Sequence, residues 1–236
     1  MKKYAILLDS TYCTGCNTCA YRCVQEFRCH DQASKGLFRT FVSTNDGGLY
    51  HKRCMHCEDP ECVKNCPVEA LTRSEYGPVL YNAKTCIGCK TCVEVCPFGI
   101  PEFDEATQKI LKCSLCAHRI GDGKPPACVE ACPTGALQFG EYAAMVERAK
   151  FTAKKHQLHI YGLEEAGGTH VIVVSKEPPV AAGYPKVPKK KTKASRNSAG
   201  DGIGLPAFAA LGIGGLKKWS DRKVLVQAQA EKKGER

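Results

Sequence analysis

Residues 86–97 read Cys-Ile-Gly-Cys-Lys-Thr-Cys-Val-Glu-Val-Cys-Pro, with the spacing Cys-x2-Cys-x2-Cys-x3-Cys-Pro. This is the ligand pattern of bacterial ferredoxins, in which three closely spaced thiolates hold one [4Fe–4S] cluster and the fourth, before proline, binds a neighbouring one. The stretch therefore predicts a ferredoxin-like fold, in which short helices follow the ligating loops.

Three more groups of four cysteines surround this run, and together they use sixteen of the 17 cysteines. The groups are Cys13-x2-Cys16-x2-Cys19-x3-Cys23, Cys54-x2-Cys57-x4-Cys62-x3-Cys66-Pro67 and Cys113-x2-Cys116-x11-Cys128-x3-Cys132-Pro133. Four such groups predict four [4Fe–4S] clusters. Cys29 lies outside the pattern, and we expect it to be a thiol that ligates nothing.

Cross-ligation between groups predicts which cysteines share a cluster, because the last cysteine of each run reaches a different cluster from the first three. The expected sets are Cys13, Cys16, Cys19 and Cys132; Cys113, Cys116, Cys128 and Cys23; Cys86, Cys89, Cys92 and Cys66; and Cys54, Cys57, Cys62 and Cys96.

Zinc sites and disulfides are the alternatives for so many cysteines. Zinc sites use pairs of Cys-x2-Cys, which would not require the third cysteine or the final Cys-Pro of these runs. Disulfides suit a small secreted chain, but no secretory signal is seen, since Met1-Lys2-Lys3 leads directly into a strand-like Ala5–Leu8. The clusters are therefore the favoured interpretation.

Hydrophobic patterning between the cysteine groups predicts repeated local elements. Hairpins are expected at 70–72 with 79–81 and at 100–103 with 109–111, and Ala136–Phe139 is expected to repeat this design. The other expected elements are a strand at 3–8, a helix at 18–28, extended segments at 36–42 and 49–51, a helix at 141–156, a strand at 169–175 and an extended linker at 177–196.

The formal charge of +10 is unevenly distributed. Residues 1–180 hold 21 Lys and Arg against 20 Asp and Glu, whereas residues 181–236 hold 13 against 4. Each cluster with four thiolates carries −2, so four clusters remove about eight charges and leave an anionic body with a basic tail. Such a tail suits an anionic membrane surface or an acidic partner, and we expect no nucleic acid ligand.

The expected fold class is α+β, with two pseudo-symmetric ferredoxin-like two-cluster modules and a C-terminal extended tail. The outer module comprises 1–53 and 97–145, and the inner module comprises 54–96. A helix–strand cap at 146–180 and a basic linker with an apolar tail at 181–236 follow. No nucleophile–base constellation or nucleotide-binding glycine motif is present, so we expect no catalytic residues and no enzymatic activity of the chain alone.

The segment Cys54-Met-His-Cys-Glu-Asp-Pro-Glu-Cys62-x3-Cys66-Pro67 resembles the four-cluster iron–sulfur subunit of the dimethyl sulfoxide reductase superfamily. The resemblance covers residues 3–176, and residues 160–171 are similar to β subunits of formate dehydrogenase and hydrogenase. It implies a wire of clusters running from the Cys13 cluster through the Cys113 and Cys86 clusters to the Cys54 cluster, with a catalytic subunit at the Cys13 end.

The resemblance also implies the partners. We expect a formate dehydrogenase-like molybdenum or tungsten subunit on one side and a membrane cytochrome b or quinone-binding subunit on the other. A nickel–iron hydrogenase relay and a freestanding soluble polyferredoxin are the alternatives. Family β subunits continue into a transmembrane helix, whereas the apolar stretch 202–216 here is short and glycine-rich. We expect 202–219 to contact a membrane or a partner, and the subunit to be membrane-associated, with periplasmic co-export preferred to a cytoplasmic location.

Overall fold

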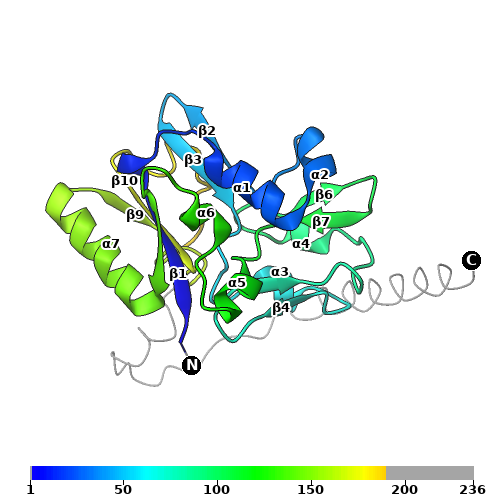
Figure 1. Cartoon of the computed structure of the whole chain (residues 1–236). Coiled ribbons are helices and arrows are strands. Elements are labelled where there is room, and N and C mark those ends of the chain that lie inside the picture. The colour runs from blue at the N-terminus through cyan, green and yellow to red at the C-terminus, as the bar shows by residue number, and fades with distance from the viewer. Residues whose placement is uncertain (1, 190–236) are drawn as a thin grey trace, which may run out of the picture.

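The strand β1 (Tyr4–Asp9) lies inside a four-stranded sheet of order β8-β1-β10-β9 in the computed structural model, which describes residues 2–189 (Figure 1). Its neighbours are β8 (Leu137–Glu141), which is antiparallel, and β10 (Val171–Ser175), which is parallel. The edge strand is β9 (His159–Tyr161). The central strands β1 and β10 are covered on both faces, as their unbroken apolar sequences require.

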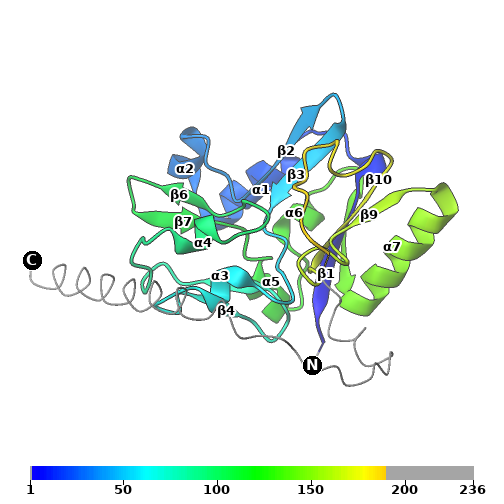
Figure 2. The ribbon, with the colours of Figure 1, turned by 180° about the vertical axis from the view of Figure 1, so that it is seen from behind.

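One face of this sheet is covered by the helix α7 (Tyr142–His156), as both ribbon views show (Figures 1 and 2). Its buried positions Met145, Ala149 and Ala153 recur at four-residue intervals and so form one stripe. Small alanines in the stripe let the helix approach the sheet closely.

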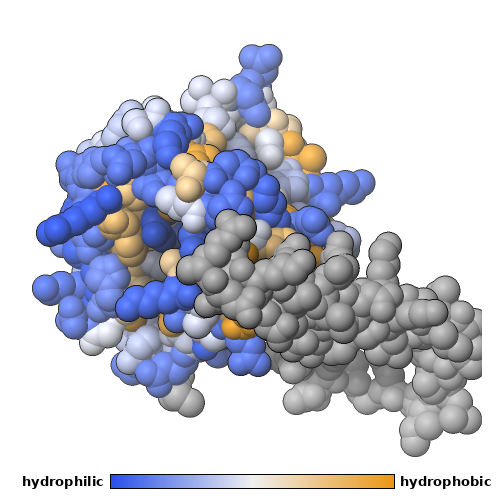
Figure 3. Space-filling model, turned by 90° about the vertical axis from the view of Figure 1, so that its right-hand side faces the viewer, coloured by the Kyte–Doolittle hydropathy of each residue, from blue (hydrophilic) through white to orange (hydrophobic). Residues whose placement is uncertain are grey.

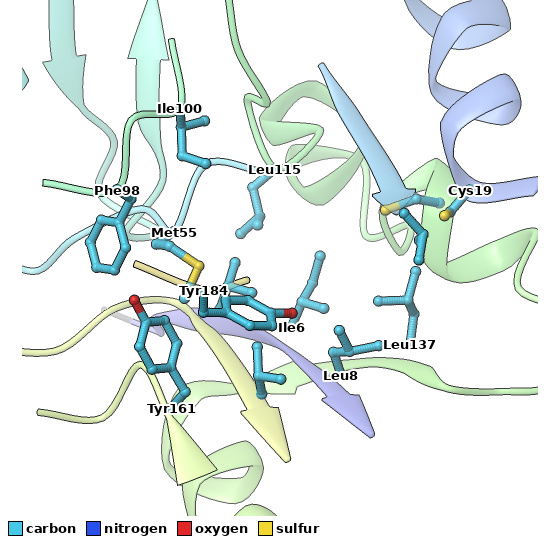
Figure 4. Packing of buried hydrophobic residues seen from close by; sticks show 14 of the residues in the cluster. Ile6, Leu8, Cys19, Met55, Phe98, Ile100, Leu115, Leu137, Tyr161 and Tyr184 are labelled. Carbon is cyan, nitrogen blue, oxygen red and sulfur yellow. The ribbon is translucent and has the colours of Figure 1, made fainter. Parts of the chain in front are cut away.

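The opposite face of the sheet contributes Ile6, Leu8 and Leu137 to the main core (Figure 4). Alternate residues of β1 thus face the two layers, because side chains alternate along a strand. The cysteine-bearing loops lie on this second side, where several cysteines belong to the same core.

Three antiparallel hairpins lie outside the large sheet in the described part of the chain. They are β2 (Thr40–Asn45) with β3 (Gly48–Arg53), β4 (Leu71–Arg73) with β5 (Val79–Tyr81), and β6 (Glu102–Asp104) with β7 (Lys109–Leu111). The hairpins expected from the sequence at 70–81 and 100–111 are confirmed with small shifts of their boundaries.

Short helices flank or follow the cysteine loops. The helix η1 (Ser10–Tyr12) precedes Cys13, and the others are α1 (Thr18–Phe27), α2 (His30–Ser34), α3 (Glu61–Lys64), α4 (Thr91–Glu94), α5 (Ala117–Gly121) and α6 (Ala127–Glu130). The helices α3, α4 and α6 end just before a Cys-Pro pair, since proline cannot continue a helix. No proline follows Cys23, and α1 runs on to Phe27.

Two expectations about the chain are wrong. Ala136–Phe139 does not start a local hairpin, because β8 pairs with β1 from the other end of the chain, with Ile6 opposite Phe139. The extended linker expected at 177–196 is not a simple linker in the part that the structure describes. Residues 177–189 form a strap over the main core, in which Ala182, Tyr184 and Val187 are buried.

The strap is held by hydrogen bonds as well as by burial. The backbone N–H of His51 donates to the Tyr184 hydroxyl at 3.2 Å, and the Tyr161 hydroxyl donates to the Pro185 carbonyl at 2.7 Å. Figure 4 shows Tyr184 beside Ile6 and Met55. The strap thus joins the β2–β3 hairpin to the large sheet.

The combination of one mixed sheet, three hairpins and several short helices within residues 2–189 belongs to the α+β class. The end of the molecule that carries α2, α4 and the β6–β7 hairpin is seen face-on in Figure 3. It is mostly hydrophilic, with hydrophobic patches between the polar side chains.

Candidate iron–sulfur sites

The first site lies between β1, the start of α1 and the start of β8. Its cavity is lined by Cys13, Cys16, Cys19 and Cys132, and it has about 340 Å³ of space not filled by atoms, its open mouth included. Cys16 is exposed, whereas Cys19 is buried. This site therefore reaches the protein surface on the Cys16 side.

A second site brings Cys23 from α1 together with three cysteines of the fourth group, Cys113, Cys116 and Cys128. These four cysteines are all buried. Burial raises the pKa of Cys23, and Cys113, Cys128 and Cys116 raise it further. Such mutual electrostatic effects require the four thiols to lie together.

Two more cavities belong to the region of the β4–β5 and β6–β7 hairpins. One is lined by Cys54, Cys57, Cys62 and Cys96, with about 380 Å³ not filled by atoms. The other is lined by Cys66, Cys86, Cys89 and Cys92, with about 350 Å³. The structure thus brings each of the sixteen cysteines singled out from the sequence into one of four groups of four. That each group ligates one cluster stays a prediction.

The geometry of these groups suits a multi-atom centre. The thiols of three groups surround spaces with mostly apolar walls, such as those formed by Phe98 and Ile100 or by Leu8 and Val42. Four thiolates around such a space are the donor set of a [4Fe–4S] cluster, so the residues present fit that group.

Burial opposes ionisation of most of these thiols in the protein alone. It raises the pKa of Cys62 and Cys92 to about 12. A buried thiolate therefore needs a positive partner, and cluster iron would supply it.

Cys113 shows the opposite shift, and this leads to residues that the sequence analysis did not single out. Burial raises its pKa, but the Arg53 guanidinium and other donors outweigh burial and leave the pKa below its usual value. The Arg53 Nη2 atom lies 3.7 Å from the Sγ of Cys113 and 3.7 Å from the Sγ of Cys128.

Lys112 is the other buried cation at the sites. Its Nζ donates to the carbonyls of Val79 at 2.6 Å and Cys113 at 2.7 Å, and its side chain lines the Cys54 cavity. The sequence signal for both residues is a basic residue directly before the first cysteine of the second and fourth groups.

Contacts between the sites contradict the cluster order expected from the resemblance. Cys54 and Cys57 pack against the main core, together with Cys19 and Cys128, whereas Cys66 and Cys92 pack in a separate apolar cluster around Leu71. Burial is the main cause that raises the pKa of both Cys54 and Cys62, and Cys113 adds to the shift of Cys54 while Cys92 adds to that of Cys62. The Cys54 site therefore lies between the Cys113 and Cys86 sites, and the Cys86 site is at the end.

The remaining predicted residues are quickly placed. Cys29 is buried at the end of α1 and lines none of the three cysteine cavities. The apolar stretch 202–216 and the contact segment 202–219 lie outside the described residues. Among residues 2–189, no helix is long and apolar enough to span a membrane.

Comparison with known proteins adds independent findings. The family model of a 4Fe-4S dicluster domain matches residues 47–142. The iron–sulfur subunit of nitrate-inducible formate dehydrogenase from Escherichia coli K12 is 34% identical over 221 residues, covering 81% of this chain and 75% of that protein. The B subunit of tetrathionate reductase from Salmonella typhimurium is 35% identical over 177 residues, covering 71% and 69%. The B component of anaerobic dimethyl sulfoxide reductase from Escherichia coli K12 is 37% identical over 139 residues, covering 52% and 66%.

Proposed function

Because this protein belongs to the iron–sulfur subunits of the dimethyl sulfoxide reductase superfamily, we propose that it carries electrons through four [4Fe–4S] clusters between a catalytic subunit and a membrane acceptor. The chain is a non-catalytic electron-transfer subunit of an oxidoreductase complex. The grouping of sixteen cysteines into four sets of four carries the proposed cluster count.

Each set is assigned one cluster. The ligands would be Cys13, Cys16, Cys19 and Cys132 for the first; Cys23, Cys113, Cys116 and Cys128 for the second; Cys54, Cys57, Cys62 and Cys96 for the third; and Cys66, Cys86, Cys89 and Cys92 for the fourth. The bound clusters supply one-electron redox chemistry, while the chain fixes their spacing and surroundings.

The four sites divide into two pseudo-symmetric modules in this proposal. The inner module, 54–96, holds the Cys54 and Cys86 sites, and the outer module, 1–53 with 97–145, holds the other two. In each module a last cysteine crosses to the other site, as in two-cluster ferredoxins.

Electrons would pass along the order Cys13, Cys113, Cys54, Cys86. Exposure of Cys16 makes the Cys13 site the accessible one beside the large sheet, and we place the catalytic subunit there. The Cys86 site, at the end with α4 and the β6–β7 hairpin (Figure 1), would face the acceptor.

The catalytic partner is proposed to be a formate dehydrogenase-like molybdenum or tungsten subunit. The alignment with the formate dehydrogenase relative is the longest of the three described, at 221 residues. Purification of the complex tests this: formate should reduce a dye. Oxidation of a reduced dye by tetrathionate or dimethyl sulfoxide, without formate activity, would reject formate as the substrate.

The acceptor is proposed to be a membrane cytochrome b or quinone-binding subunit, and the complex to be co-exported to the periplasmic side. Protease treatment of spheroplasts should then digest the subunit without lysis. Digestion only after lysis would place it on the cytoplasmic side and leave the relay function standing.

Metal analysis tests the cluster count itself. Anaerobically purified protein should contain about sixteen iron atoms and about sixteen acid-labile sulfides per chain. Stoichiometric zinc with little iron would refute the proposal.

A further inference from the structure

Two cations stand out because they are buried without a carboxylate. The exposed fraction of Arg53 is 1% and that of Lys112 is 2%, and no other Lys or Arg within residues 2–189 is buried. Neither forms an ion pair with any described carboxylate, although sixteen ion pairs occur elsewhere. A buried charge without a counter-charge is strongly unfavourable, so both residues point to negative groups at the sites themselves.

Arg53 also has buried hydrogen-bond donors without acceptors, which again indicates a negative group beside it. Its Nη2 atom faces two cysteine sulfurs, while its Nε and Nη1 atoms are buried and have no hydrogen-bond partner. A guanidinium has five donors in a fixed fork. Sulfide and thiolate sulfurs of a bound cluster would be acceptors for such donors.

Lys112 is held by backbone carbonyls rather than by sulfur atoms, and it lies at the Cys54 site. Two backbone carbonyls hold its ammonium group, and its side chain forms part of the wall of the Cys54 cavity. The carbonyl dipoles do not neutralise the charge. Its field therefore acts on whatever occupies that cavity, through protein of low dielectric constant.

The two placements are reciprocal. Arg53 directly precedes Cys54 in the sequence but contacts Cys113 and Cys128. Lys112 directly precedes Cys113 but lines the cavity of Cys54. Arg53 therefore faces the Cys113 site, and Lys112 faces the Cys54 site, so each cation serves the site that is distant from it in the sequence.

We infer that Arg53 and Lys112 are built-in counter-charges that raise the reduction potentials of the Cys113 and Cys54 clusters, respectively. The inference rests on the proposed cluster sites. One electron takes an oxidised cluster with four thiolates from −2 to −3, so a fixed cation beside it favours the reduced form. Net charge and hydrogen bonds to sulfur are two of the means by which proteins set cluster potentials.

The test is redox titration of the intact complex, followed by electron paramagnetic resonance. Arg53→Met should lower the midpoint potential of the Cys113 cluster most, and Lys112→Met that of the Cys54 cluster most. Signals are assigned beforehand with the ligand variants Cys116→Ser and Cys57→Ser. If a mutation only disturbed the neighbouring ligand in the sequence, Arg53→Met would affect the Cys54 cluster and Lys112→Met the Cys113 cluster. The expected pattern is the opposite, so such a disturbance would not produce it.

Charge-retaining variants separate tuning from packing. Arg53→Lys and Lys112→Arg change shape but keep the charge, so potentials should stay closer to the parent values than in the methionine variants. Lys35→Met is the matched surface control. The Lys35 side chain is 49% exposed, is paired with Asp104 and lines none of the three cysteine cavities, so solvent screening should leave the cluster potentials nearly unchanged.

The outcomes divide cleanly. Sixteen iron atoms with unchanged potentials in both methionine variants would overturn the inference and leave the relay standing. Absence of four clusters from the parent protein would instead overturn the proposed function. If Arg53→Met does not assemble, the Lys112→Met titration decides alone, and a shift confined to the Cys113 cluster there would contradict the crossed arrangement.

Discussion

Asn17 and Val42 form a two-way clamp between the first cysteine loop and β2. The Asn17 side-chain amide donates to the Val42 carbonyl at 2.8 Å, and the Val42 N–H donates to the Asn17 Oδ1 atom at 2.6 Å. Asn17 has φ of 56° and lies between two cysteines of the Cys13 site. Asparagine is one of the few residues that tolerate this left-handed conformation.

Asn17→Ala is therefore expected to destabilise the protein by about 2–4 kcal/mol, from two lost hydrogen bonds of roughly 1 kcal/mol each and the left-handed backbone. The free energy of unfolding in urea would measure this. The Cys13 cluster signal should weaken first. Asn17→Gly, which removes only the backbone penalty, should recover part of the loss, and equal stability of all three proteins would contradict the clamp.

Serine substitution at the two ends of the proposed wire should have different effects, because serine oxygen is a poorer ligand for cluster iron than thiolate. Cys89→Ser should leave dye-linked activity of the catalytic subunit intact and abolish most quinone-linked activity. Cys16→Ser should leave the Cys86 cluster present but no longer reduced by the catalytic substrate. Normal quinone-linked activity in a Cys89→Ser complex shown to lack that cluster would refute the proposed order.

Glu26 connects α1 to α5 and gives a pH-dependent prediction. It accepts hydrogen bonds from His118 at 2.9 Å and from Arg119 at 3.3 Å, and these partners lower its pKa below the ordinary 4.5. A lowered pKa means that its stabilising contribution is complete above about pH 4.5 and is lost as the pH falls further. Glu26→Gln should therefore lower the urea midpoint at pH 7, and by less at pH 4.

The matched control for this prediction is Glu130→Gln. Glu130 pairs with Arg119 and Arg22, as Glu26 does, but its side chain is 51% exposed rather than 14%. Exposed ion pairs contribute little. The urea midpoint, followed by circular dichroism, should change less for Glu130→Gln than for Glu26→Gln at both pH values. An equal effect of the two variants would argue against burial as the cause.

Gly77 allows the β4–β5 turn to approach the large sheet. Its φ is +106°, and a Cβ atom there would lie 2.2 Å from the Cε1 atom of His170, which is fully buried. Gly77→Ala should cost more than Gly99→Ala, whose added methyl meets nothing within 4 Å at φ of +60°. Gly99→Ala measures the cost of the left-handed backbone alone, about 1–2 kcal/mol. The difference between the free energies of unfolding in urea of the two variants then gives the cost of the clash with His170. This difference should vanish if His170 can move aside.

Local sequence patterns were enough for much of the fold. The cysteine spacings and the turns beside them fixed the loops, short helices and inner hairpins, because all of these form between residues close in the chain. The pairing of Ile6 with Phe139 could not be predicted in this way, since hydrophobic runs such as Ala5–Leu8 carry no information about which distant strand they join.

Other features escaped prediction for physical reasons. Tyr184 stands in a stretch rich in proline and lysine, a composition typical of linkers, yet it packs at 3% exposure because the core offers it a site. Arg53 and Lys112 carry no hydrophobic signal of burial. The expected position of the Cys54 site came from family resemblance, whereas the packing of its cysteines in the folded chain shows which sites lie beside it.

The parallel pairing of β1 with β10, in which Ile6 lies opposite Val171, has a consequence for biosynthesis. After β1 has been made, it cannot pair with β8 until about 130 more residues have been added, or with β10 until about 165 more, on the order of ten seconds or more at ordinary rates of synthesis. All the cysteines of the inner pair of sites come no later than Cys96, so these two sites can gather their ligands early. We therefore expect each site to receive its cluster once its last ligand has been made, so that the Cys13 site, although nearest the N-terminus, is completed among the last.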